Sequence, residues 1–162
     1  MQNSFNWKKE LFSDTYKVYS NNKQIGELKN RTFSQTSVGE INGKRYTFKT
    51  KGFFKQHTQI FDNSDNSLIG DIAYGNWMTK AFLSIKERKL LWKYNNAWNT
   101  KWSICESDRT LINYNGSSKG HIESDINDDL LLLTGLYVTN YYWQMTLFII
   151  AAAWIPIYLA SR

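Results

Sequence analysis

The sequence has a single cysteine, a single proline and two histidines among its 162 residues. Because Cys105 stands alone, no intramolecular disulfide and no cysteine-rich metal site can form, which favours a reducing compartment. One proline and an aromatic content of 16% argue against a disordered chain. The start, MQNSFNWKKELF, has no apolar stretch followed by small residues and does not predict a secretory signal. We therefore expect one packed cytoplasmic domain.

Signatures of catalysis are also scarce. There is no glycine-rich phosphate loop and no dinucleotide-binding fingerprint, and His57 and His121 leave little room for a nucleophilic site. In KGHIESDINDD, alternation would place His121, Glu123 and Asp125 on one face of a strand, where they could hold a divalent ion. A solvated strand edge leading into an acidic helix start is the favoured alternative. We expect no enzymatic activity and no cofactor, with a metal-dependent enzyme as the lesser alternative.

Positive charge is concentrated in two stretches of a chain whose formal net charge is +6. No acidic residue lies between Glu40 and Asp62, and Glu87 is the one acid between residues 80 and 93. This balance suits an anionic partner, either lipid headgroups or nucleic acid, although a solvated face without a partner is an equal alternative. Aromatic residues in KRYTFKTKGFFK alternate with the charges, so core packing is favoured over base stacking. The candidate anion-binding residues are Lys44, Arg45, Lys49, Lys51, Lys55, Lys86, Arg88 and Lys89.

Up to about residue 125 the hydrophobic pattern has a period of two, interrupted by turn residues, and no helix is required. Asn42-Gly43 is the strongest short hairpin signal. An apolar residue, a glycine, an acid and an apolar residue recur at 25–28, 38–41 and 69–72. Glycine within a strand marks a bulge, a bend or a close backbone approach. The pattern predicts ten to twelve short strands in a sheet that is curved enough to close.

A different pattern begins near residue 125. Ser124, Asp125 and Asn127 are candidate N-caps, and Asp128 and Asp129 fall where a helix dipole favours negative charge. From residue 130 to 161 no Asp, Glu, Lys, Arg or His occurs, so the helix is apolar on every side. As one helix, residues 130–160 would extend roughly 46 Å, against about 30 Å for a bilayer core. We therefore expect a division near Trp143 or Gln144.

Curved hairpins with I-G-D/E strands, followed by an acidic cap and LLLLTGLYVTNYYW, resemble the tubby C-terminal-like superfamily, which includes tubby, the phospholipid scramblases and the plant LURP-one-related proteins. The resemblance implies a mainly β fold, an antiparallel closed or nearly closed barrel around a hydrophobic C-terminal helix. It also implies an association with membranes. Residues 1–144 would form the barrel with a plug helix at about 127–143, and residues 145–162 an apolar tail.

Three hypotheses follow. The first is a non-enzymatic tubby-like barrel that associates with anionic phospholipid, is cytoplasmic, and is attached to the membrane through the tail. The second is a soluble cytoplasmic scaffold or interaction module whose C-terminal helix is fully buried, in part at a homo-oligomer interface. The third is the metal-dependent enzyme that uses His121, Glu123 and Asp125.

Overall fold

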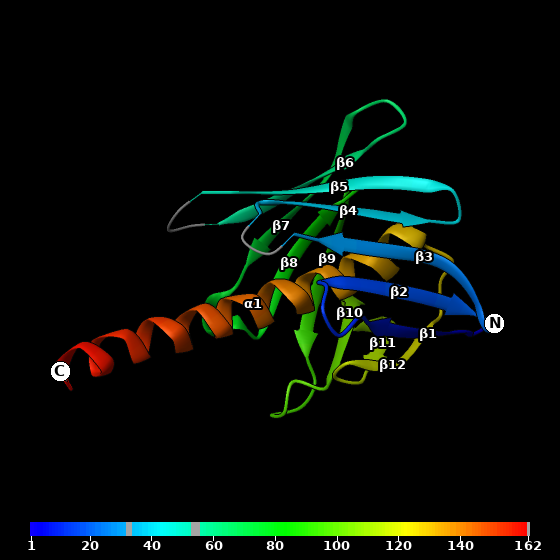
Figure 1. The fold of residues 1–162 in the computed structure, drawn as a ribbon. Helices are drawn as coiled ribbons and strands as arrows, with labels where there is room; N and C mark the ends of the chain where they lie inside the picture. The colour runs from blue at the N-terminus through cyan, green and yellow to red at the C-terminus, as the bar shows by residue number, and fades with distance from the viewer. Residues whose placement is uncertain (32–33, 53–55, 162) are drawn as a thin grey trace.

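A computed structural model describes residues 1–31, 34–52 and 56–161. The described residues form twelve β-strands, one short 3₁₀ helix (η1) and one long α-helix (Figure 1). In chain order they are β1 (Asn3–Lys9), β2 (Thr15–Ser20), β3 (Lys23–Asn30), β4 (Thr36–Ile41), β5 (Lys44–Lys51), β6 (His57–Asp62), β7 (Ser67–Tyr74), η1 (Asn76–Met78), β8 (Lys80–Ile85), β9 (Arg88–Tyr94), β10 (Lys101–Glu106), β11 (Arg109–Asn115), β12 (Lys119–Ser124) and α1 (Asp129–Ala160).

The strands form a closed antiparallel barrel. Each strand pairs with the strands before and after it in the chain, and β1 also pairs with β12, where Asn3 faces Ser124. Closure leaves no unpaired sheet edge between the first and last strands. The predicted mainly β fold, a closed antiparallel barrel with a C-terminal helix, is confirmed.

Alternation along each strand sets which side chains enter the barrel. On β5, Tyr46 and Phe48 are buried, whereas Arg45, Lys49 and Lys51 are exposed. Because successive side chains of a strand point to opposite faces, the basic residues lie on the outer wall, as the sequence indicates. The same pattern in the other strands produces a core of Trp, Tyr, Ile and Leu side chains.

Glycines within strands coincide with changes of pairing register. Gly26 faces Val18 and Gly70 faces Ile60, and the register shifts immediately beyond each of these pairs. A Cβ atom at Gly26 would lie 2.7 Å from the carbonyl oxygen of Glu40, so no larger residue fits without a shift of the neighbouring strand. The predicted association of strand glycines with bulges and close backbone approach is confirmed at these two positions.

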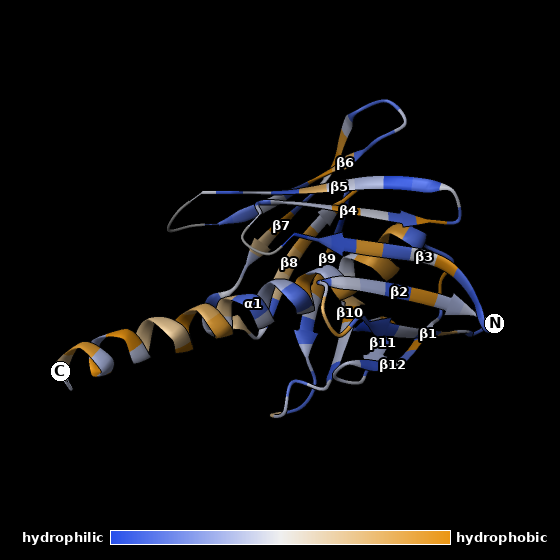
Figure 2. Cartoon of the chain, in the orientation of Figure 1, coloured by the Kyte–Doolittle hydropathy of each residue, from blue (hydrophilic) through white to orange (hydrophobic). Residues whose placement is uncertain are grey.

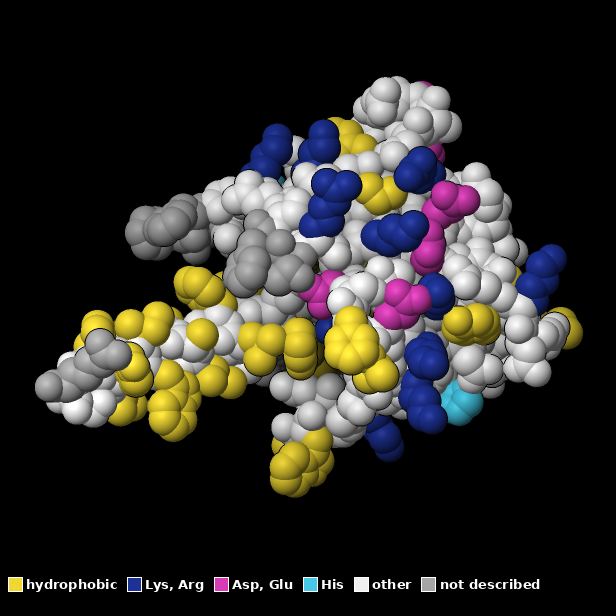
Figure 3. Space-filling model, in the orientation of Figure 1, with side chains coloured by type: hydrophobic (Ala, Val, Ile, Leu, Met, Phe, Trp, Pro, Cys, Tyr) yellow, Lys and Arg dark blue, Asp and Glu magenta, His cyan; other side chains and the backbone are white. Residues whose placement is uncertain are grey.

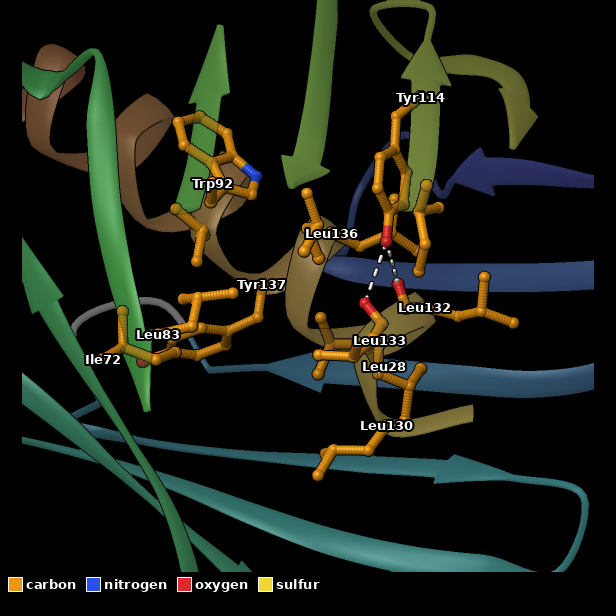
Figure 4. Close-up of a cluster of buried hydrophobic side chains, with 14 of the residues drawn as sticks. Leu28, Ile72, Leu83, Trp92, Tyr114, Leu130, Leu132, Leu133, Leu136 and Tyr137 are labelled. Carbon is orange, nitrogen blue, oxygen red and sulfur yellow. Dashed lines mark hydrogen bonds between the residues drawn. The ribbon is translucent and has the colours of Figure 1, made fainter. Parts of the chain in front are cut away.

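The first half of α1 fills the barrel. Residues 130–138 are all buried. In Figure 4, Leu133 lies beside Leu28, and Tyr137 lies beside Ile72 and Leu83. The Tyr114 hydroxyl donates to the carbonyl oxygens of Leu131 (2.8 Å) and Leu132 (3.3 Å). A Cβ atom at Gly135 would lie 2.2 Å from the Tyr114 ring, so the helix approaches the wall as closely as glycine permits.

Three local details differ from the expectation. The N-cap is Asp128, whose carboxylate accepts from the backbone N–H of Leu131 (3.1 Å), because Ser124 still belongs to β12. The helix does not break near Trp143 but continues through Pro156 to Ala160. The short helix η1 was not expected, and its turn places Trp77 at φ +67°.

The barrel has two distinct ends. Since consecutive strands are antiparallel, their connections alternate between the ends. The N-cap end, where α1 begins, has connections 21–22, 42–43, 63–66, 86–87 and 107–108. The exit end, from which α1 emerges, has connections 10–14, 31–35, 52–56, 75–79, 95–100 and 116–118, of which 32–33 and 53–55 lie outside the described residues.

Candidate functional site

The second half of α1 projects from the barrel. Burial ends at Tyr142, and none of residues 143–160 is buried (Figure 1). Toward its C-terminal end this segment is mostly hydrophobic (Figure 2), and large side chains such as Phe148, Trp154 and Leu159 are more than 60% exposed. An all-apolar helix face is stable only against protein or lipid. The hypothesis that one chain buries its entire C-terminal helix is therefore wrong for the described chain.

The length of the projecting segment matches a bilayer. Among the described residues, α1 is the one helix that is long and apolar enough to cross a membrane by length and composition. Its last 18 residues, 143–160, none of them buried, would extend about 27 Å, close to the roughly 30 Å hydrocarbon core. The helix is continuous at Trp143, and what changes there is its burial.

A ring of tyrosines fixes the helix where it leaves the barrel. The Tyr141 hydroxyl donates to Gln56 Oε1, and the Tyr142 hydroxyl donates to the carbonyl oxygen of Lys80. The Tyr74 ring stacks on Tyr141 with centroids 3.8 Å apart. These contacts come from three separate connections or strands, so the direction of the helix is set by the barrel.

The same tyrosines have perturbed acidity. Burial raises the pKa of Tyr142 to about 12 and that of Tyr94, which lies beside it, to about 12. Burial also raises the pKa values of Tyr74 and Tyr137, although hydrogen bonds with Thr58 oppose the shift for both. These hydroxyls stay protonated at neutral pH, and that of Tyr142 donates its hydrogen to the carbonyl oxygen of Lys80 at the exit.

Charge is distributed unevenly between the two ends of the barrel. To compare the ends, each strand is split at its midpoint into an N-cap half and an exit half. The N-cap half carries seven cations and ten carboxylates among the described residues, a net charge of −3. The described exit half carries four carboxylates and eleven cations, a net charge of +7. The eleven are Lys8, Lys9, Lys17, Lys29, Arg31, Lys49, Lys51, Lys80, Lys93, Lys101 and Lys119. The apolar segment thus leaves from the half with the positive net charge. Figure 3 shows this segment and the basic side chains spread over one face of the barrel.

The structure separates the basic residues that the sequence grouped together. Lys49 and Lys51 lie in the exit half, on β5, whereas Lys55 lies outside the described residues. The other five, all of which lie in the N-cap half, are Lys44, Arg45, Lys86, Arg88 and Lys89. A strand of about seven residues tilted in a barrel separates the ends by roughly 20 Å, about two Debye lengths at physiological salt. Those five therefore lie at the end of the barrel opposite the one from which residues 143–160 emerge.

Part of this N-cap group has a structural role. Arg88 makes a bidentate contact with Glu106 (2.9 and 3.0 Å) and lies 3.7 Å from Asp128, the helix cap. The guanidinium lowers the pKa of the Glu106 carboxyl through this hydrogen bond. Lys44 lies 3.8 Å from Asp129 in the first helical turn. These contacts hold the helix start at the barrel mouth.

The residues of the metal hypothesis are not brought together. His121 and Glu123 lie on the outer face of β12, and Asp125 follows the strand; all three are exposed. Alternate residues of a strand are about 7 Å apart, and these side chains are open to solvent. Among the residues that the structure describes, no three His, Cys, Asp or Glu side chains are grouped in a way that could hold a metal ion.

The chain matches no protein-family model, no curated protein and no solved structure. Any role of the exit end is therefore inferred from the structure of this chain and not from relatives. Sequence reasoning missed Lys80 and Lys101 as members of the same positive surface as Lys51, because they are far apart along the chain. Their common placement follows from the meander, in which every second connection lies at the same end.

Proposed function

We propose that this protein is a non-enzymatic, tubby-like barrel of the cytoplasm that is held on an anionic membrane by residues 143–160, with its exit end facing the bilayer. The observation that carries the proposal is the continuous helix α1, buried as far as Tyr142 and then, over residues 143–160, without a buried residue and without a charged one. Leu, Ile, Phe and Trp side chains exposed on every side gain free energy by entering hydrocarbon.

The charge distribution supports the same orientation. Cations near an anionic leaflet are attracted by about 1 kcal/mol each, and the attraction falls off within a Debye length. The exit half, with a net charge of +7, would lie within that distance of the surface, and the N-cap half, with a net charge of −3, would point away.

The test is fractionation of the full-length protein in alkaline carbonate beside a charged variant, Ile150→Arg/Trp154→Arg. Both positions are exposed, so the barrel keeps its core, whereas each arginine near the centre of a spanning helix costs about 2.5–3.5 kcal/mol. The matched control, Asn113→Arg/Ser161→Arg, adds the same charge at exposed positions outside the segment. We expect the unmodified chain and the control to remain with the membrane, and the charged variant to be released.

Release of all three proteins would overturn the proposal. If the released full-length chain formed a defined oligomer by light scattering, and the charged variant were monomeric, residues 143–160 would instead be an interface between copies, which is the scaffold hypothesis.

A further inference from the structure

The connections at the two ends of the barrel differ in chemistry. At the N-cap end they consist of Asn, Gly, Ser, Asp, Lys and Glu. Three connections at the exit end instead carry large apolar side chains that are almost fully exposed: Leu11 (86%), Phe12 (102%), Trp77 (90%) and Trp98 (85%). Single exposed apolar residues are ordinary, but their confinement to the connections of one end is not explained by folding.

The backbone conformation of the turn 75–79 holds the Trp77 side chain in an exposed position. Trp77 has φ +67° and Met78 has φ +53°, a left-handed conformation that costs a bulky residue about 1–2 kcal/mol. In this conformation Met78 packs against the core while the indole of Trp77 points into solvent. Backbone strain at bulky residues clusters at functional sites.

Trp77 and Trp98 lie beside the emerging helix. With Tyr142 and Trp143 they line a groove of about 540 Å³ between the helix exit and the connections 75–79 and 95–100. Leu11 and Phe12 lie on the connection that also holds Asp14, which accepts a hydrogen bond from Gln144 on the helix (3.4 Å). The apolar tips therefore surround the point at which the helix would enter a membrane.

We infer that Leu11, Phe12, Trp77 and Trp98 form a lipid-contacting rim, a second contact that inserts into the headgroup region of the bilayer beside the helix. This inference rests on the proposed function and adds a contact surface to it. Tryptophan is enriched at membrane interfaces because its ring is apolar and its N–H remains hydrated. Exposed lysines at the same end, such as Lys51, Lys80 and Lys101, would reach anionic headgroups from around this rim.

A consequence is that the barrel has a fixed orientation, with its exit end against the bilayer, and does not reorient about the helix. Contacts at 10–14, 75–79 and 95–100 come from different parts of the barrel circumference, and three separate points define a plane. The N-cap end would then lie roughly 20 Å further from the headgroups.

The experiment places a fluorescent label on single cysteines of the full-length chain. In a Cys105→Ser background, Phe12→Cys and Trp98→Cys report on the rim, and Asp65→Cys and Asp108→Cys are matched exposed positions at the N-cap end. Each protein is bound to vesicles of phosphatidylcholine and phosphatidylserine that contain lipids brominated in their acyl chains. We expect the labels at positions 12 and 98 to show a blue-shifted emission. We also expect the brominated lipids to quench these two labels several times more strongly than the labels at positions 65 and 108.

Two results would overturn the inference, and they are distinguishable. If the protein floats with the vesicles while all four positions are equally unquenched, the helix alone holds the barrel, and the proposed function stands without the rim. If the protein does not float with the vesicles, both the proposed function and the rim are wrong.

Discussion

The ammonium group of Lys9 lies over the indole ring of Trp143, 3.8 Å from the ring centroid, and 3.3 Å from the carboxylate of Asp14. Trp143 is the first residue of α1 beyond the buried part, and Lys9 ends the strand that closes the barrel. A residue that starts the projecting segment is thereby held by the barrel wall. The orientation of the helix is thus linked to the fold through a half-buried cation.

We expect the Lys9–Trp143 pair to stabilise the barrel by about 0.5–2 kcal/mol, the range of partly desolvated cation–π contacts. A double-mutant cycle of Lys9→Gln and Trp143→Leu, measured by urea unfolding in a mild detergent, gives this coupling. Asp14→Asn serves as the control, because it removes the ion pair and leaves the ring contact. Strictly additive single substitutions would show that the two residues are only neighbours.

Substitution of Gly135 tests the fit of the helix inside the barrel. A Cβ atom there would meet the Tyr114 ring at 2.2 Å, so Gly135→Ala should lower the free energy of unfolding by about 1–3 kcal/mol, despite alanine's better helix propensity. The second variant, Gly135→Ala/Tyr114→Leu, relieves the overlap and should be less destabilised than the two single changes predict. Chemical denaturation measures both, and simple additivity would contradict the proposed overlap.

Alkaline pH should unfold the protein because its buried tyrosines cannot ionise in place. The pKa values of Tyr94 and Tyr142 are about 12 in the folded chain, against an ordinary value of 10.0. The unfolded chain therefore loses these protons first as the pH rises. This contribution to stability is fully present below pH 10, declines above it, and is lost by about pH 12.

Near-ultraviolet circular dichroism and phenolate absorbance, recorded together against pH, measure this transition. The two signals should change in parallel, and Tyr94→Phe should make the decline in stability less steep. Ionisation of most tyrosines without loss of the dichroism signal would show that their hydroxyls are accessible in the folded barrel.

Two sets of substitutions with equal net charge separate the location of charge from its total. Lys51→Gln/Lys80→Gln/Lys101→Gln alters the exit half, and Lys44→Gln/Arg45→Gln/Lys86→Gln alters the N-cap half. We expect the exit set to weaken binding to phosphatidylserine vesicles by about 3 kcal/mol, roughly a hundredfold, and the N-cap set to have little effect.

This affinity is measured by vesicle sedimentation on a version that ends at Gln144, which retains all residues buried in the barrel and lacks the apolar segment. Its far-ultraviolet dichroism confirms folding before the comparison. Equal losses for both sets would indicate a general charge effect without orientation, and a stronger loss for the N-cap set would reverse the proposed orientation.

The strand pattern and the helix were predictable from the sequence because they depend on local periodicity. Three signals depend only on residues that are close together in the chain. They are the alternation in the segment that forms β5, the Asn42-Gly43 turn and the glycines within strands. The absence of charge from 130 to 161 is likewise visible without a structure, and it requires burial in protein or lipid.

What the sequence by itself determined is therefore a closed meander and an apolar helix that is too long for the barrel interior alone or for the bilayer core alone. Only the tertiary structure decided that the helix stays continuous, that burial ends at Tyr142, and that Lys51, Lys80 and Lys101 share an end with Trp77 and Trp98. The physical reason is that barrel height sets how much of the helix is covered. Closure of the sheet sets which distant connections become neighbours, and neither quantity is encoded in a short window of residues.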